Sequence, residues 1–258
     1  MKSKTIMQRA APFGAVLLTL LTSCGHSSDS PAPTVPTTSY QGNVVLVDEF
    51  GNKVADRSGV TVSVVDQLTT MTTTDATGNF TLAVPQGTQR LNFTKAGYGT
   101  YLTAPTSISG SGFTAAKSVA LGQTASTYLT YFRSWDYIFS GEYYRFMGRI
   151  SANSTSAQVR YHRIFFATSK DVSPTNYKAT SLFKGSFADP SGTPNWYWVT
   201  DSVSRATVTS INAGPYDKVY GVVYGDNPAA DTYVDPASGR TIYPAVSKQS
   251  ADVLEFNR

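Results

Sequence analysis

Histidine, the side chain that most often serves as a catalytic base, is rare in this chain and isolated where it occurs. The 258 residues include 2 histidines, His26 and His162. A Ser-His-Asp site would have to use His162, because His26 stands in a Pro/Ser/Thr-rich stretch. No HExxH sequence, nucleophile elbow, phosphate loop or dinucleotide fingerprint occurs, and His162 stands in a strand-like run between two arginines. We therefore predict no catalytic residue, no metal, no cofactor and no enzymatic activity.

Carboxylates offer a second route to catalysis, because two Asp or Glu side chains suffice for glycoside hydrolysis. Nearly every aspartate borders Gly, Asn, Pro or Ser, as residues of turns do. The densest acidic loop extends from Asp226 to Asp235, where a solvated loop is favoured and a calcium site is the alternative. Paired carboxylates elsewhere leave a surface polysaccharide hydrolase, or its accessory subunit, as the alternative function.

Aromatic side chains are better candidates for recognition. The 3 tryptophans of the chain are Trp135, Trp196 and Trp198. In a strand, Trp196 and Trp198 share a face, and exposed flat rings suit sugars or a protein partner. We predict these three residues as candidate ligand contacts, since a few aromatic anchors supply most of the energy of an interface. The competing interpretation is that these residues pack in the core or at a seam between domains, and that role is the more common one for large aromatic side chains.

The N-terminus combines a basic start, an apolar run and a cysteine. Residues 10–23 are apolar but shorter than the roughly 20 residues that a spanning helix needs. The following Leu21-Thr22-Ser23-Cys24 resembles the bacterial lipobox, in which a signal peptidase cleaves before a cysteine that becomes lipid-modified. Cys24 is the 1 cysteine of the chain, so no internal disulfide competes for its thiol.

This resemblance implies a protein of the cell envelope, attached to a membrane by lipid on Cys24, with residues 1–23 removed as a signal peptide. Gly25 takes the place of the aspartate that resembles an inner-membrane retention signal in some Gram-negative bacteria, which favours the outer membrane. Residues 24–39 are rich in Pro, Ser and Thr, and we predict a flexible tether there. Cleavage removes three basic residues and no acidic ones, so the formal charge falls from +4 to +1, which argues against a nucleic-acid partner.

From residue 40 onward the hydrophobic pattern has a period of two, which is typical of strands. Helix-favouring residues are scarce, while Thr, Val, Tyr and Ser abound. The pattern predicts strands at residues 42–47, 60–64, 80–84, 91–93, 143–151, 158–168, 205–211, 218–224 and 251–256. The predicted fold is all-β, with two antiparallel β-sandwich domains in tandem, and a polar break at residues 122–126 divides them into residues 40–123 and 124–258.

The first predicted domain contains the segment Thr74-Asp75-Ala76-Thr77-Gly78-Asn79-Phe80 and a strand that ends Lys95-Ala96-Gly97-Tyr98. Both are similar to the carboxypeptidase regulatory-like domain, a transthyretin-like β-sandwich. In the first segment we expect the Asp75 carboxylate to cap local N–H groups, Gly78 to supply a positive φ and Phe80 to return to the core. The resemblance implies a spacer-like role and brings no catalytic residues.

The second predicted domain resembles a fibronectin type III module in two segments. Residues 159–169 are similar to its central aromatic strand, and residues 213–224 to the Gly-then-Tyr entry to its penultimate strand. Together these features predict a non-catalytic cell-surface lipoprotein, which acts as an anchored binding or structural module for a protein or glycan partner.

Overall fold

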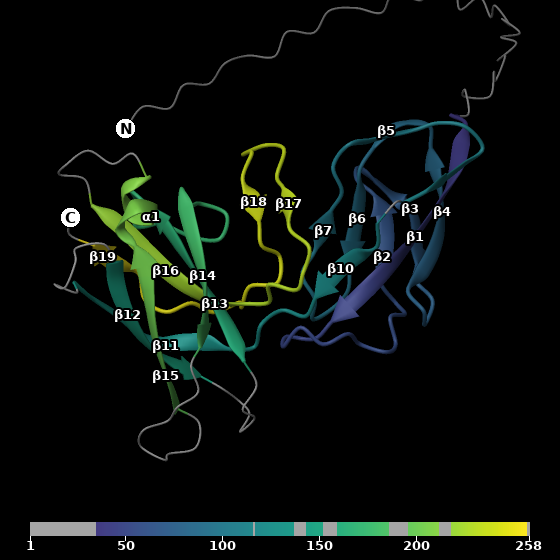
Figure 1. Cartoon of the computed structure of the whole chain (residues 1–258). Helices are drawn as coiled ribbons and strands as arrows, with labels where there is room; N and C mark the ends of the chain where they lie inside the picture. Colours follow the sequence, from purple (N-terminus) through teal and green to yellow (C-terminus); the bar gives the residue numbers. More distant parts are fainter. Residues whose placement is uncertain are drawn as a thin grey trace, which may run out of the picture. The chain divides into compact units, whose positions relative to one another are not determined.

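The computed structural model describes residues 35–115, 117–136, 143–151, 159–185, 196–211 and 218–256. Within these residues the regular secondary structure is almost entirely β-strand, as the composition predicts, with one short helix (Figure 1). No helix in the described ranges is long and apolar enough to cross a membrane. Cys24 and most of the predicted tether lie outside the described residues, so lipidation and the envelope location stay predictions.

Residues 35–122 form the first group of strands (Figure 1). One sheet has the order β10-β1-β4 with β9 also paired to β1, another has the order β3-β2-β6-β7, and β5 pairs with β8. Pairing is antiparallel as predicted, except that β1 runs parallel to β9 and β10. The strands are β1 (Thr37–Val47), β2 (Thr61–Val64), β3 (Gln67–Thr73), β4 (Asn79–Pro85), β5 (Gly87–Gln89), β6 (Leu91–Thr94), β7 (Tyr101–Leu102), β8 (Thr106–Ile108), β9 (Gly112–Thr114) and β10 (Val119–Gly122).

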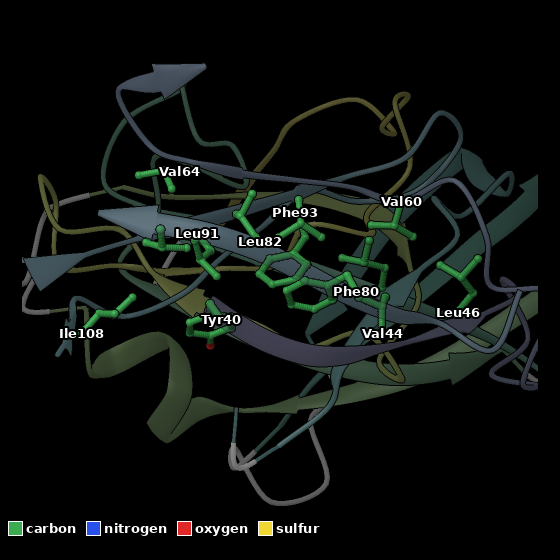
Figure 2. Close-up of a cluster of buried hydrophobic side chains, with 13 residues drawn as sticks. Tyr40, Val44, Leu46, Val60, Val64, Phe80, Leu82, Leu91, Phe93 and Ile108 are labelled. Atoms are coloured by element: carbon green, nitrogen blue, oxygen red, sulfur yellow. The ribbon is translucent and has the colours of Figure 1, made fainter. Parts of the chain in front are cut away.

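These strands enclose one hydrophobic core to which both larger sheets contribute (Figure 2). Along β4 the burial alternates, with Phe80, Leu82 and Val84 inside and the residues between them exposed. Val62 of β2 and Phe93 of β6 reach the same cluster from the second sheet. Each such side chain contributes about 1.5–3 kcal/mol when it is fully buried, so period-two alternation is what stabilises this part of the chain.

The turn before β4 has the geometry that the sequence predicts. Oδ1 of Asp75 accepts hydrogen bonds from the backbone N–H groups of Thr77 and Asn79, both at 2.9 Å. Gly78 has a φ of 86°, and a Cβ there would lie 2.1 Å from the carbonyl oxygen of Val44. Glycine is therefore required at this position both by the backbone conformation and by the close approach of β1.

β1 begins earlier than the predicted strand at residues 42–47. Its first residues pair with β4, from Thr37 opposite Pro85 to Asn43 opposite Asn79. The Thr38 hydroxyl, buried under the sheet edge, donates to the carbonyl of Gly110 at 2.7 Å. Residues 37–39 of the predicted tether therefore belong to the sheet, a pairing that their polar Thr-Thr-Ser sequence does not indicate.

Residues 128–256 supply the second group of strands, all of them antiparallel. One sheet has the order β11-β12-β15, another β14-β13-β16-β19, and β17 pairs with β18. The predicted strand at residues 143–151 coincides with β12, and those at 158–168, 218–224 and 251–256 overlap β13, β16 and β19. The strands are β11 (Tyr128–Asp136), β12 (Tyr143–Ser151), β13 (Arg160–Ala167), β14 (Ala179–Gly185), β15 (Trp196–Ser204), β16 (Val219–Asp226), β17 (Tyr233–Val234), β18 (Thr241–Ile242) and β19 (Leu254–Phe256).

β13 is buried on both of its faces. Ile164 and Phe166 belong to a cluster that includes Val203 of β15, whereas Phe165 and Ala167 belong to a different cluster. That second cluster packs against Tyr243 and Val246, which follow β18. A strand covered on both sides needs a continuous apolar run, and this explains why the segment lacks clean alternation.

The predicted strand at residues 205–211 is wrong, because Arg205–Thr209 form a short helix, α1. Ser204 caps it: the hydroxyl oxygen accepts a hydrogen bond from the N–H of Thr207 at 3.1 Å. Val208 on the helix is fully buried in the core. Thr and Val give the segment a strand-like composition, but the N-cap and this single buried contact decide its conformation.

Candidate functional site

A pocket of about 210 Å³ opens beside β1, β9 and β10. Its lining divides into an aromatic wall and a polar edge. The wall consists of Tyr40, Phe80, Phe93, Tyr101 and Phe113. Polar side chains of the lining include Asn43, Thr103, Thr106, Lys117 and Asp231.

The aromatic wall is a chain of packed rings that extends from the core to the pocket. Tyr40 stacks on Phe113 with ring centroids 5.0 Å apart and an interplanar angle of 26°. Phe93 lies 6.0 Å from Tyr101, which is itself 6.0 Å from Tyr233. Tyr40 and Phe93 are buried, whereas Tyr101 and Phe113 are half-buried and leave part of their rings accessible.

Both tyrosines of the wall stay protonated over the physiological pH range. Burial raises the pKa of Tyr40, and the neighbouring Tyr101 adds to the rise. Burial also raises the pKa of Tyr101, with a smaller contribution from the negative charge of Asp231. The phenol groups therefore serve as neutral hydrogen-bonding groups, not as bases.

The polar edge is an ion pair in which the backbone holds the carboxylate. The Lys117 ammonium donates to Oδ1 of Asp231 at 3.0 Å, and this hydrogen bond raises the pKa of Lys117. The N–H of Ala120 donates to Oδ2 of the same carboxylate at 2.9 Å. The Lys117 side chain is 81% exposed and that of Asp231 22%, so the pair lies at the solvent edge of the pocket.

Asp231 reaches this pocket from the second predicted domain, on a stretch that we call the return segment (residues 227–247). The backbone N–H of Asp231 donates to the carbonyl of Ala120 at 2.9 Å. The Asn227 side-chain amide donates to the carbonyls of Asp48 at 2.8 Å and Gln123 at 3.1 Å. The return segment thus packs on the first group of strands and completes the edge of their pocket.

A second pocket, of about 350 Å³, lies beside the predicted domain boundary. It is lined by residues 123–126, by Ser247, Lys248 and Gln249, and by Gly97 and Tyr128. No carboxylate and only one aromatic residue belong to this lining. The first pocket therefore offers the richer recognition chemistry.

His162 lies within β13, in the sheet where the sequence pattern puts it. Its ring is fully buried and stacks on Phe183 at 5.8 Å. Burial and the charge of Arg160 lower the pKa of His162 to about 3, so the ring is neutral. Neither ring nitrogen has a hydrogen-bond partner, so no serine–histidine–aspartate relay forms among the described residues.

The acidic loop from Asp226 to Asp235 distributes its carboxylates to separate partners. Asp226 accepts from Arg163, Asp231 pairs with Lys117, and Asp235 accepts from the N–H and hydroxyl of Ser238. In the described part of the chain no group of three or more His, Cys, Asp or Glu side chains is placed to hold a metal ion. Each of these three carboxylates therefore orders part of the structure around it.

The three predicted ligand contacts fall in one sheet. Trp135 of β11 pairs with Arg145 of β12, and Trp198 of β15 pairs with Arg149, which also lies on β12. Trp196 begins β15. Their side chains lie outside the part of the molecule that the structure describes, so the tryptophan site stays a prediction.

Composition and spacing give little indication of the pocket that the structure does describe. Phe80 and Phe93 are recognisable as core residues of strands, whereas Tyr40 precedes the strand predicted at residues 42–47, and nothing local marks these residues as the wall of a pocket. Asp231 stands in the acidic loop of the sequence, but its partners Lys117 and Ala120 are more than a hundred residues away. The single available signal is the density of aspartates around it.

No protein-family model and no curated protein sequence matches this chain. Among solved structures, the chain is similar to a candidate carbohydrate-binding protein of Bacteroides uniformis, with 11% identity, a TM-score of 0.32 and coverage of 86% of this chain and 100% of that one. It is also similar to a DUF3823 family protein of the same species, with 12% identity, a TM-score of 0.29 and coverage of 86% and 99%. A protein of a cohesin–X-dockerin complex of Acetivibrio cellulolyticus is 26% identical, with a TM-score of 0.28 and coverage of 34% and 58%. At these TM-scores the likeness carries no argument, so the function has to be inferred from the residues of this chain.

Proposed function

We propose that this protein is a non-catalytic binding module of the cell envelope, which takes a glycan or protein partner. The observation that supports it is the first pocket, whose lining combines the partly accessible residues Tyr101 and Phe113 with the ion pair of Lys117 and Asp231. Mostly apolar walls with a few fixed polar groups are typical of ligand sites. The Asp231 carboxylate already accepts hydrogen bonds from Lys117 and Ala120, so it is better suited to bind a ligand than to act as a base.

Catalysis of glycoside hydrolysis is a poor fit to this pocket. The reaction commonly uses two carboxyl groups, about 5–9.5 Å apart, one of which donates a proton to the leaving oxygen. The lining contains one carboxylate, that of Asp231, and its two oxygens accept from Lys117 and Ala120. A role as the accessory subunit of a hydrolase needs binding alone and is compatible with the same pocket.

The envelope location rests on the lipobox-like Leu21-Thr22-Ser23-Cys24 and on the absence of any other cysteine from the chain. Lipid on Cys24 would hold the binding module at a membrane, with Gly25 favouring the outer membrane. We therefore propose that the partner belongs to the envelope or reaches it from outside.

The test combines retention and cleavage. The full chain is run in native gels that contain soluble polysaccharides and is also cross-linked in intact cells, while the release of reducing ends is assayed in parallel. We expect retention by a polysaccharide, or one specific cross-linked envelope protein, with no reducing ends released. Release of reducing ends would support the hydrolase instead, and neither retention nor a specific cross-link would overturn the binding function.

A further inference from the structure

We infer that the first pocket binds a single neutral sugar ring, a hexopyranose residue of a larger glycan. The inference rests on the proposed binding function and names the ligand class. Three features of the described residues carry it: the size of the pocket, the preformed aromatic wall, and the pair of opposite charges at the edge.

The size of the pocket limits the ligand to one ring. Sites for drug-sized ligands measure roughly 300–1,000 Å³, whereas this pocket measures about 210 Å³. A peptide segment or several linked sugars would not fit inside. One terminal or side-branch residue of a glycan would fit, with the rest of the chain outside.

The aromatic wall offers a flat apolar surface that is already oriented. Phe113 stacks on the buried ring of Tyr40, and Tyr101 lies between the rings of Phe93 and Tyr233. Because these contacts fix the rings, little side-chain entropy would be lost on binding. The C–H groups of a pyranose face carry partial positive charge and suit the negative face of an aromatic ring.

The polar edge matches a pair of neighbouring hydroxyl groups. The Lys117 ammonium has three N–H donors and uses one on Asp231. Each Asp231 oxygen accepts one hydrogen bond, from Lys117 or from Ala120, and keeps capacity for a second. One sugar hydroxyl can therefore donate to Asp231 while the next accepts from Lys117, and both bonds are of the stronger charge-assisted kind.

The same edge argues for a neutral sugar over other ligands. An anionic ligand would meet the Asp231 carboxylate, and a cationic ligand would meet the Lys117 ammonium. A phenyl side chain of a protein partner would fill the aromatic part, but it would displace water from the two charges and could not replace the lost hydrogen bonds, which is costly. A phenol has one hydroxyl group for the two charges, whereas a sugar ring offers each of them a hydroxyl of its own.

The test measures saturation-transfer NMR on the full chain in lauryldimethylamine oxide micelles, a detergent without a sugar headgroup. The probes are the methyl α-pyranosides of glucose, galactose and mannose, and the comparison compounds are glucuronate, glucosamine and 4-methylphenol. We expect at least one neutral glycoside to receive saturation more strongly than the three comparison compounds. The signals of micelles without protein are subtracted, because 4-methylphenol enters the detergent. No protein-dependent transfer to any glycoside, or equal or stronger protein-dependent transfer to a comparison compound, would overturn the inference.

Two variants tie the signal to this pocket. Lys117→Met removes the donor at the edge, and Lys218→Met is the matched control, because Lys218 is also an exposed lysine paired with a carboxylate, that of Glu255. Phe113→Leu keeps an apolar side chain and removes the ring face. We expect Lys117→Met to weaken glycoside binding about tenfold, as for a lost bond to a charged group, and Phe113→Leu to weaken it as well, while Lys218→Met binds like the wild type.

These outcomes separate the sugar inference from the proposed function. If Lys117→Met and Phe113→Leu both bind like the wild type, the sugar lies elsewhere and the inference for this pocket is overturned. If a partner is retained in the native gels or cross-linked in cells but no glycoside binds, the sugar inference fails and the binding function stands. If nothing is retained or bound, both fail.

Discussion

Arg163 and Asp226 form a charged pair in the interior of the second group of strands. The Arg163 Nε donates to Oδ2 of Asp226 at 2.7 Å, and the two side chains are 10% and 3% exposed. The guanidinium also lies 3.7 Å from the centroid of the Tyr243 ring. Burial raises the pKa of Asp226, and the charge and hydrogen bond of Arg163 oppose that rise. The pair therefore links β13 and β16 to the end of the return segment.

We predict that Asp226→Ala lowers the free energy of unfolding by about 3–5 kcal/mol, because it leaves the Arg163 charge buried without its carboxylate. Urea denaturation of the full chain measures the change. Glu255→Gln, which removes the carboxylate of the exposed Lys218 pair, is the control and should leave the denaturation midpoint nearly unchanged. Equal midpoints for Asp226→Ala and the wild type would show that the buried pair is dispensable.

The buried His162 should make the free energy of unfolding decrease at acidic pH. Burial, together with the charge of Arg160, lowers its pKa from 6.5 to about 3 in the folded protein, so the unfolded chain binds a proton there that the folded chain does not. The contribution of His162 to the free energy of unfolding is therefore complete above about pH 6.5. It is lost as the pH decreases toward 3, by up to about 1.4 kcal/mol per pH unit.

The variant His162→Leu should flatten this dependence. Between pH 6.5 and about 4.5 the wild type should lose about 2 kcal/mol more than the variant in urea titrations. Subtracting the variant removes the contributions of carboxylates such as Asp226, which titrate in both proteins. The idea is refuted if the two proteins show parallel stability curves over that range.

Among the elements, the turn between β3 and β4 depends on two separate properties of Gly78. Its φ is 86°, and a Cβ would lie 2.1 Å from the carbonyl oxygen of Val44. Gly97 has a similar φ of 82° but nothing within 4 Å of the Cβ position. The two glycines therefore form a matched pair that separates backbone strain from the steric clash with β1.

We predict that Gly97→Ala lowers stability by about 1–2 kcal/mol, the cost of a left-handed conformation in a residue with a Cβ. Gly78→Ala should cost more, since it adds the clash with Val44 and must shift β1 or the turn. Thermal unfolding of both variants gives the comparison. Similar melting temperatures would mean that the strand pair relaxes freely around the added methyl group.

At the scale of the whole molecule, the return segment joins the two groups of strands. Asn227 is buried and its amide serves two carbonyls, those of Asp48 and Gln123. Glu49 adds a further contact: its carboxylate accepts from the N–H of Ser126 at 2.8 Å and lies 3.7 Å from Arg160. The boundary predicted at residues 122–126 stays a prediction, and these contacts cross it.

We predict that Asn227→Ala lowers the melting temperature of the full chain, with a loss of about 1–3 kcal/mol, because two carbonyls lose their donor. Asn43→Ala is the matched control, since the Asn43 amide also donates to two oxygens, those of Thr77 and Asn79, but at an exposed site. Calorimetry compares the two variants. An unchanged melting temperature for Asn227→Ala would show that the return segment does not couple the two groups.

The predicted lipid on Cys24 determines where the whole molecule is located. Cys24→Ser should abolish lipidation, because it removes the thiol that the lipobox-like sequence presents. The protein should then remain unprocessed or be released, whereas the wild type should partition into the detergent phase. A variant that fractionates with membranes as the wild type does would rule out the lipid anchor.

Local sequence predicts eight of the 19 strands in the described residues and the turn at Asp75, since period-two burial and turn chemistry act between near neighbours in the chain. It misleads at residues 205–211, where strand-favouring residues form α1 because Ser204 caps a helix and Val208 finds a buried position. The pocket is decided by the tertiary structure alone. Lys117 and Asp231 meet only after the return segment packs on β10, and no local pattern encodes a contact between residues so far apart. Phe80 and Phe93 are core residues by sequence, whereas Tyr101 and Phe113 lie on strands that the local pattern does not predict, and the packing of β1 and β9 leaves part of Phe113 accessible.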